Sequence, residues 1–302
     1  MVRRSFLRSR IGMAVMAVVA AVAGTAIAAT AANSAPQQEA KAPALPDAFR
    51  YVSSLDLECF RTNPYQPPQK PLTLTHLNPV LAGQAPWTIQ GLGPRTQLCS
   101  PVMKNDRLPP EDVLDFVRFT DLSCYRIGGP NIQFPVKLSH LNPVLKDFPD
   151  RAVTLLAPEQ LCVPVIKNDE KPPDAVLRFV EFIDLACYRE TPQVPLETTL
   201  KLTQLNRALS DVQPTDVRVR ENRQLCVPVR KNAQKIPDDV LKIVQYIDLE
   251  KFDIIAPTMA PFTLRLTHIN PLLAGLPAEE ATLQARWQLA VPMAKNGNVP
   301  TG

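Results

Sequence analysis

The sequence predicts an all-β protein built from four tandem copies of one small unit. The phrase Gln-Leu-Cys-x-Pro-Val-x-Lys-Asn closes each copy, at residues 97–105, 160–168, 224–232 and 288–296, with alanine replacing cysteine and methionine replacing valine in the last. Each copy also contains short runs of β-branched or alternating apolar residues, bounded by proline and asparagine. The phrases begin 63 or 64 residues apart, so the repeat divides the chain into four small units, although its length alone would suit one or two ordinary domains.

The repeat defines the expected domains. They are a signal peptide at 1–28, a disordered linker at 29–45, and repeats at 46–107, 108–170, 171–234 and 235–302. We expect four small β-barrels or β-sandwiches, each held by a disulfide except the last. A four-bladed β-propeller is the alternative. Propellers usually close by sharing the strands of one blade between the two chain ends, whereas this chain starts and ends in the same phase of the repeat.

The elements of one copy follow from copies two and three. Residues 176–184 are dense in β formers and predict a first strand, although the preceding Pro-Pro-Asp also suits a short helix. Residues 136–140 alternate apolar and polar side chains, which predicts a second strand ending at an Asn-Pro turn. Residues 153–156 and 160–165 predict the third and fourth strands, and a proline-rich connector follows.

Residues 1–28 have the features of an export signal. Four arginines between residues 3 and 10 precede an apolar stretch, and Ala-Ile-Ala at 26–28 suits a signal peptidase. Arg-Arg-Ser-Phe-Leu-Arg at 3–8 resembles the twin-arginine motif, and a general secretory signal is the alternative. The apolar stretch is marginal for a span of about twenty residues. We therefore expect a secreted protein, extracellular or associated with the cell envelope, with no stable membrane span after signal removal.

The charge of the mature chain excludes one class of partner. The net charge of +4 reflects 33 basic and 29 acidic residues. The signal carries four of the basic residues and no acidic one, so the remainder is formally neutral. Because nucleic-acid binders usually carry a basic face or stripe, we expect no nucleic acid among the partners.

Six cysteines in an exported chain predict disulfides. Copy four lacks both cysteine positions at once, with Lys251 and Ala290 in their place, so the two positions are expected to be partners. Each disulfide closes a loop of about forty residues, which contributes roughly 4 kcal/mol in the chain-entropy model. The predicted pairs are Cys59–Cys99, Cys124–Cys162 and Cys187–Cys226.

The histidines occupy one recurring position and predict no chemistry. His76, His140 and His268 lie in the same slot, which Gln204 fills in copy three. A general base or metal ligand loses its role as glutamine, whereas a hydrogen-bonding structural residue keeps it. Each copy offers only two thiols and at most one histidine, and no catalytic motif occurs. We therefore expect no catalytic residue, metal or cofactor.

Three polar positions recur in all four copies. The asparagine of the Asn-Pro turn suits a turn that bonds its own backbone. The lysine of Lys-Asn is a candidate partner for the aspartate of Asp-Leu, and a binding surface displayed four times is the alternative. The turn asparagines are Asn78, Asn142, Asn206 and Asn270, the lysines are Lys104, Lys167, Lys231 and Lys295, and the aspartates are Asp56, Asp121, Asp184 and Asp248.

Variation is concentrated between the Asn-Pro turn and the third strand, for example at residues 82–96 and 275–286. Trp87 lies in the first of these stretches and Trp287 follows the second. An exposed tryptophan can hold a sugar ring or a partner side chain, so both are candidate recognition residues, with core packing as the alternative. The expected ligand is an envelope polysaccharide or a secreted protein.

The combined motifs resemble an uncharacterised repeat domain of exported bacterial proteins. The resemblance spans residues 46–302 and is carried by Cys124-Tyr125 with residues 161–168 and by Cys187-Tyr188 with residues 225–232. It implies no particular activity. The sequence predicts a secreted, non-catalytic binding or structural module at the cell surface, and the alternative is a secreted hydrolase whose active site lies between repeats.

Overall fold

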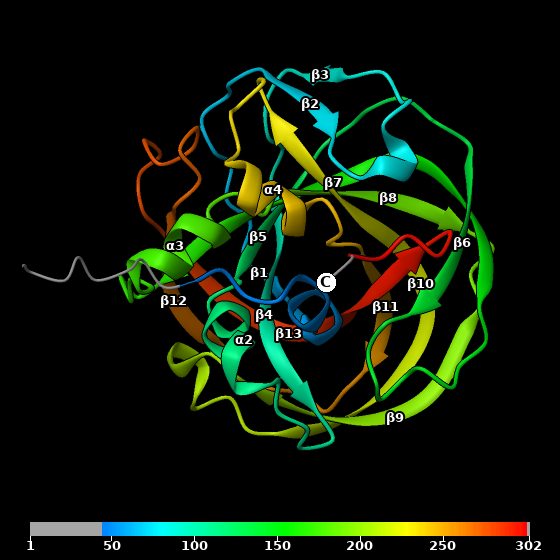
Figure 1. Ribbon diagram of the computed structural model, residues 1–302. Helices are drawn as coiled ribbons and strands as arrows, with labels where there is room; N and C mark the ends of the chain where they lie inside the picture. Colours follow the sequence, from blue (N-terminus) through cyan, green and yellow to red (C-terminus); the bar gives the residue numbers. More distant parts are fainter. Residues whose placement is uncertain (1–43, 301–302) are drawn as a thin grey trace, which may run out of the picture. The chain divides into compact units, whose positions relative to one another are not determined.

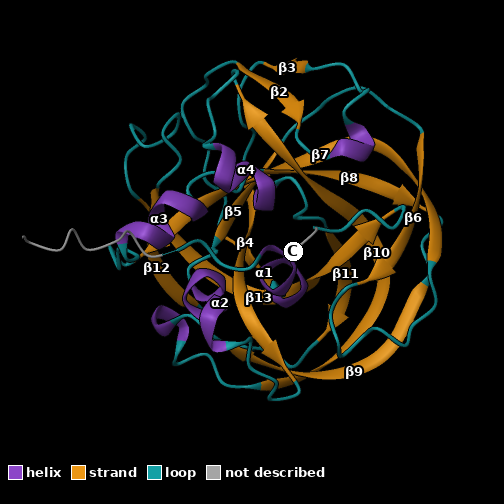
Figure 2. Cartoon of the chain, in the orientation of Figure 1, coloured by secondary structure: helices purple, strands orange, loops and turns teal. Residues whose placement is uncertain are grey.

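The strands of all four copies belong to one antiparallel sheet of 13 strands (Figures 1 and 2). The computed structural model describes residues 44–300, so the predicted signal peptide and most of the predicted linker lie outside the described residues. The helices are α1 (Ala48–Ser54), α2 (Glu111–Arg118), α3 (Asp174–Val180) and α4 (Asp238–Val244), with 3₁₀ turns at Pro79–Leu81 and Arg207–Leu209. The strands are β1 (Leu57–Thr62), β2 (Leu72–His76), β3 (Trp87–Ile89) and β4 (Arg95–Lys104) in copy one, β5 (Leu122–Arg126), β6 (Phe134–His140) and β7 (Arg151–Lys167) in copy two, β8 (Leu185–Thr191), β9 (Pro195–Gln204) and β10 (Thr215–Lys231) in copy three, and β11 (Leu249–Ile255), β12 (Phe262–His268) and β13 (Glu279–Lys295) in copy four.

Eight of these strands close a ring. Their hydrogen-bonded order is β1, β4, β5, β7, β8, β10, β11, β13 and back to β1. Each copy contributes its first and last strands, which pair with each other and with the adjacent copies. A closed ring leaves no sheet edge among its members, which removes the unpaired backbone groups that an open edge exposes.

The second strands of the copies connect each copy to the one opposite. β6 pairs with β7 of its own copy and with the end of β13. β9 likewise pairs with β10 and β4, and β12 pairs with β13 and β7. β2 pairs with β3 and the end of β10. In Figure 1, β2, β6, β9 and β12 lie at four positions around the periphery, so every copy is bonded to its neighbours and to its opposite.

These pairings confirm the all-β class and the repeat but correct the arrangement. Four separate barrels or sandwiches are wrong, because strands of different copies share backbone hydrogen bonds in one sheet. The propeller is wrong for the same reason, since its blades are separate four-stranded sheets. The physical cause is that the first and last strands of one copy form only a two-stranded ribbon, whose outer edges are paired by the neighbouring copies.

The predicted first strand at 176–184 is also wrong. These residues form most of α3, which starts after Pro173, and the strand begins only at Leu185. Val176, Phe179 and Val180 are buried on one face of the helix, so their packing outweighs their β propensity. The predicted third and fourth strands are one strand, β7, with register shifts between Leu155 and Gln160. The predicted second strand lies within β6.

The four helices cover one end of the ring, as Figure 1 shows. Side chains from each helix pack in one apolar cluster with residues inside the ring. That cluster contains Tyr51, Phe116, Phe179 and Ile243 from the helices, the recurring leucines Leu57, Leu122, Leu185 and Leu249, and all six cysteines. Within the described residues, no helix is long and apolar enough to cross a membrane.

Candidate functional site

The recurring lysine and aspartate form a buried ion pair in every copy, as predicted. Lys104 Nζ lies 2.6 Å from Asp56 Oδ1 and Lys167 Nζ lies 2.5 Å from Asp121 Oδ1. Lys231 pairs with Asp184, and Lys295 pairs with Asp248. Burial lowers the pKa of each lysine and raises the pKa of each aspartate, while the partner's charge acts in the opposite direction. Because the lysines are buried, they do not form the alternative binding surface.

The recurring asparagines connect neighbouring copies. Asn142 Oδ1 accepts the Val144 N–H at 2.9 Å, which is the predicted turn, and its amide donates to Asp56 Oδ2 of the preceding copy at 2.5 Å. The same cross-copy bonds join Asn206 to Asp121, Asn270 to Asp184, and Asn78 to Asp248. The last bond closes the circle between copies one and four. The recurring lysines, aspartates and asparagines are therefore scaffold.

The histidine slot is part of the packing between opposite copies. His76 Nε2 lies 2.9 Å from the Tyr188 hydroxyl, and His268 Nε2 lies 3.0 Å from the Tyr125 hydroxyl. His140 instead stacks on Phe252, with ring centroids 6.2 Å apart. Burial lowers the pKa of His76 and His268 to about 4 and that of His140 to about 3. All three rings are neutral at pH 7.

These histidines predict an acid-sensitive fold. Between pH 6.5 and 4.5 the unfolded chain binds protons that the folded histidines do not, so the histidine contribution to the free energy of unfolding falls as the pH is lowered. His140→Gln copies the glutamine of copy three and should reduce that fall by about 2–3 kcal/mol. Urea denaturation of both proteins at pH 6.5 and 4.5 measures this. An unchanged pH dependence would show that His140 does not carry the lowered pKa.

The three disulfides have the predicted pairing and lie inside the ring. They join Cys59 to Cys99, Cys124 to Cys162, and Cys187 to Cys226. Each pair is directly opposite across two neighbouring ring strands, and in copy four Lys251 is opposite Ala290 in the same way. Across the copies, Cys99 Sγ lies 3.9 Å from Cys124 Sγ and Cys162 Sγ lies 3.6 Å from Cys187 Sγ. These eight positions form one continuous layer.

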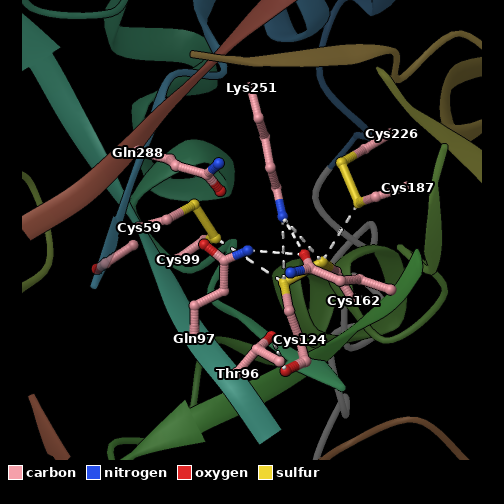
Figure 3. Close-up of a disulfide and its surroundings, with 12 residues drawn as sticks. Cys59, Thr96, Gln97, Cys99, Cys124, Cys162, Cys187, Cys226, Lys251 and Gln288 are labelled. Carbon is pink, nitrogen blue, oxygen red and sulfur yellow. Dashed lines mark hydrogen bonds between the residues drawn. A yellow bond between two sulfur atoms is a disulfide. The ribbon is translucent and has the colours of Figure 1, made fainter. Parts of the chain in front are cut away.

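Lys251 is the polar member of this layer. Its Nζ donates to Gln160 Oε1 at 2.8 Å and lies 3.6 and 3.7 Å from the sulfur atoms of Cys162 and Cys124 (Figure 3). The side chain is only 2 % exposed. Burial lowers its pKa to about 7, and the charge of Glu159 acts in the opposite direction. A large fraction of Lys251 is therefore a neutral amine at neutral pH.

A hollow of about 640 Å³ lies next to this layer, toward the ends of the ring strands. We call it the axial pocket. Its inner part contains the glutamines that open the recurring phrase, each two residues from a position of the disulfide layer and therefore on the same inward face. Gln160, Gln224 and Gln288 line it, and Gln97 donates to Gln160 Oε1 at 2.7 Å. The other lining residues are Arg61, Thr96, Arg126, Ile127, Glu159, Arg223, Asp253 and Trp287.

The acids of the axial pocket are already engaged. Asp253 accepts from Arg223 Nε at 2.5 Å and from Gln288 Nε2 at 3.0 Å. Glu159 accepts from Gln224 Nε2 at 2.7 Å. The bonds to Glu159 and Asp253 fix the orientation of the Gln224 and Gln288 amides. The Oε1 atoms of both amides are buried with no hydrogen-bond partner among the described residues.

Two arginines of the axial pocket lack such partners. Arg61 lies over the Trp287 ring, with its guanidinium carbon 4.5 Å from the ring centroid. Neither Arg61 nor Arg126 makes an ion pair with any residue in the range 44–300. Arg223, in contrast, pairs with Asp253 and lies near Glu221. Arg189 lies 3.9 Å from Glu159. The pocket lining therefore has three arginines against two carboxylates, a formal excess of one positive charge, and Arg61 and Arg126 are the arginines without a direct ion-pair partner among the described residues.

The two candidate tryptophans have different environments in the structure. Trp87 is 9 % exposed and packs against His76 and Tyr188, with centroids 5.2 and 6.1 Å away. It is a core residue, so its proposed recognition role is not supported. Trp287 lines the axial pocket.

Sequence reasoning missed Lys251 and Asp253. Both lie where copy four departs from the other three: Lys251 replaces a cysteine, and Asp253 replaces the arginine found at 61, 126 and 189. The sequence shows that copy four departs at these positions, but it does not show that the equivalent positions of all four copies lie close together in the fold. It follows from the ring, which brings the equivalent position of every copy to one axis.

Comparison with protein-family models, with curated proteins and with solved structures finds no match for this chain. Over residues 44–300, no group of three or more His, Cys, Asp or Glu side chains is arranged to hold a metal ion. Three disulfides are typical of proteins from oxidising compartments.

Proposed function

We propose that this protein is an exported, non-catalytic binding module that holds an acidic sugar unit of an envelope polysaccharide in the axial pocket. The observation that carries the proposal is the pair of arginines without ion-pair partners, Arg61 and Arg126, at the mouth of a pocket whose two carboxylates are engaged. Arginine binds carboxylates through charge-assisted, often bidentate hydrogen bonds. A carboxylate ligand would compensate this charge.

The separation between residues that hold the fold together and residues that line the pocket supports a binding role. The recurring cysteines, lysines, aspartates and asparagines form disulfides, ion pairs and turns, whereas the pocket combines the recurring glutamines with side chains that differ between copies, such as Asp253 and Trp287. A closed ring holds these side chains on rigid strands, which preorganises a binding site.

The glutamines explain why we propose a sugar. The Oε1 atoms of Gln97, Gln224 and Gln288 have no hydrogen-bond partner among the described residues, so each has the capacity to accept a hydrogen bond from a ligand. Hydroxyl groups are neutral donors that satisfy such acceptors without adding charge next to Lys251. A sugar acid supplies both the hydroxyls and the carboxylate. The export signal predicted at residues 1–28 and the disulfides support a location in an oxidising compartment, where envelope polymers occur.

Trp287 provides a direct test. The chain has two tryptophans, so the Trp87→Phe variant retains a single tryptophan, Trp287, in the axial pocket. We expect galacturonate to change its fluorescence in a saturable way and galactose to have little effect. Arg126→Gln should weaken galacturonate binding about tenfold or more, since a charge-assisted hydrogen bond contributes roughly 1.5–3 kcal/mol. Arg265→Gln is the matched control, because Arg265 is exposed and pairs with Asp169 away from the pocket.

Equal responses to galactose and galacturonate, or to the two arginine variants, would contradict the proposal. Retention of an acidic peptide but not of galacturonate would favour a secreted protein as the ligand. Release of a cleaved product from an oligogalacturonate, lost in Asp253→Asn, would favour the hydrolase alternative.

A further inference from the structure

Five lysines are buried among residues 44–300, and one of them differs from the rest. Lys104, Lys167, Lys231 and Lys295 each contact an aspartate. Lys251 contacts Gln160 and two sulfur atoms. Burying a lysine without a counter-charge favours the neutral amine, and a neutral amine is the nucleophilic form of lysine.

The surroundings of Lys251 contain little that would restore its charge. On β5 and β7 its neighbours are Cys124, Cys162 and Gln160, on β10 it is paired with Gln224, and on β13 with Ala290. The one charged group that acts on it is Glu159, and that carboxylate is hydrogen-bonded to Gln224.

Gln160 connects the amine to the axial pocket. Its side chain lines the pocket, and its Oε1 is the acceptor that holds Lys251 Nζ. Lys251 itself does not line the pocket, so a pocket ligand contacts Nζ by displacing the Gln160 carbonyl from this hydrogen bond. A carbonyl oxygen can make the same hydrogen bond, and it brings its carbon next to the amine.

We propose that Lys251 is a covalent binding site, at which the amine forms an imine with a 2-oxo acid bound in the axial pocket. The proposal rests on the pocket assigned above. A 2-oxo acid combines the two required groups, because its carboxylate suits Arg61 and Arg126 and the adjacent carbonyl is the electrophile.

The reaction needs no oxidant, reductant or metal. The Nζ lone pair forms a bond to the carbonyl carbon, the carbonyl π pair moves to oxygen, and a proton passes from nitrogen to that oxygen to give a carbinolamine. Loss of the hydroxyl with the remaining nitrogen proton releases one water and leaves the carbon–nitrogen double bond. The imine hydrolyses by the reverse steps, so binding is reversible.

Reductive trapping tests the proposal. The full mature protein is incubated at pH 7 with pyruvate and sodium cyanoborohydride, which reduces an imine to a stable secondary amine, and the modified residues are mapped by peptide mass spectrometry. At pH 7 the neutral fraction of an amine with a pKa of about 7 exceeds that of an ordinary exposed lysine about 1,000-fold. We expect Lys251 to be labelled at least tenfold faster than exposed Lys146, and labelling to saturate at one group per chain.

Three variants separate the explanations. Lys251→Met should abolish the saturable label, the matched control Lys146→Met should retain it, and Arg126→Gln should raise the pyruvate concentration needed for half labelling. Labelling confined to exposed lysines, or unsaturable, would overturn the proposal. If Lys251→Met does not fold, site mapping in the unaltered protein decides. Galacturonate binding without Lys251 labelling would reject the covalent site and leave the proposed function intact.

Discussion

Replacing Lys251 and Ala290 together by cysteine is expected to create a fourth disulfide and to raise the free energy of unfolding by about 4 kcal/mol. The two residues are directly opposite on β11 and β13, in the same register as Cys59 and Cys99 on β1 and β4. The new loop would match the separations of 38–40 residues in the existing disulfides. The substitution also removes a buried amine without a counter-charge, so both changes act in the same direction.

Thermal unfolding with and without a reductant measures this effect. For a protein of this size, 4 kcal/mol corresponds to a rise of roughly 10 °C in the unfolding midpoint. The control is Lys251→Ser with Ala290→Ser, which removes the lysine but forms no disulfide. A double-cysteine protein with two free thiols, or with the stability of the serine control, would show that the fourth position is not equivalent to the other three.

The parts of the structure that could be predicted are those that recur. The pairing of Cys59 with Cys99 followed from the joint loss of both positions in copy four. The pairing of Lys104 with Asp56 followed from two charges of opposite sign that never vary. Recurrence removes chance as an explanation, because a functional residue needs to occur once, whereas a structural one is needed in each copy.

The ring was not predictable in this way. A repeat period shows which residues make up one copy, but it does not show which strands pair with the outer strands of that copy. Here β1 pairs with β13, which is more than 200 residues away in the sequence. Nothing local distinguishes a strand that pairs within its copy from one that pairs with the next. The sequence favoured a strand over the helix α3 for a related reason, since Val176 and Phe179 become helical through packing beneath the helical layer rather than through local preference.

The candidate site shows the same limit. Arg126 and Asp253 are far apart in the sequence and occupy equivalent positions of copies two and four. From the sequence alone, the difference between them is indistinguishable from ordinary variation between copies. Only closure of the ring brings these slots together around one axis. The differences between copies, set among the shared glutamines, therefore mark the place where this protein has a specific chemistry.

The second large effect is expected for Lys231→Met, which should lower the free energy of unfolding by about 3–5 kcal/mol. Lys231 is buried against Asp184, and its loss leaves a carboxylate buried with the neutral amide of Asn270 as its remaining side-chain partner. Removing one partner of a buried ion pair has this cost because the other charge stays desolvated. Urea denaturation at pH 7 measures it, with exposed Lys201→Met as the control, since that lysine pairs with Asp106 at the surface.

The shape of the unfolding transition adds a second test in the same experiment. Because the four copies share one hydrogen-bonded ring, destabilising copy three should shift the whole transition and not only a quarter of it. Asp184→Asn added to Lys231→Met should restore part of the lost stability, because it removes the stranded charge while keeping an acceptor for Asn270. Two separate transitions would show that the copies fold independently, and a double variant as unstable as Lys231→Met would show that the loss comes from packing and not from charge.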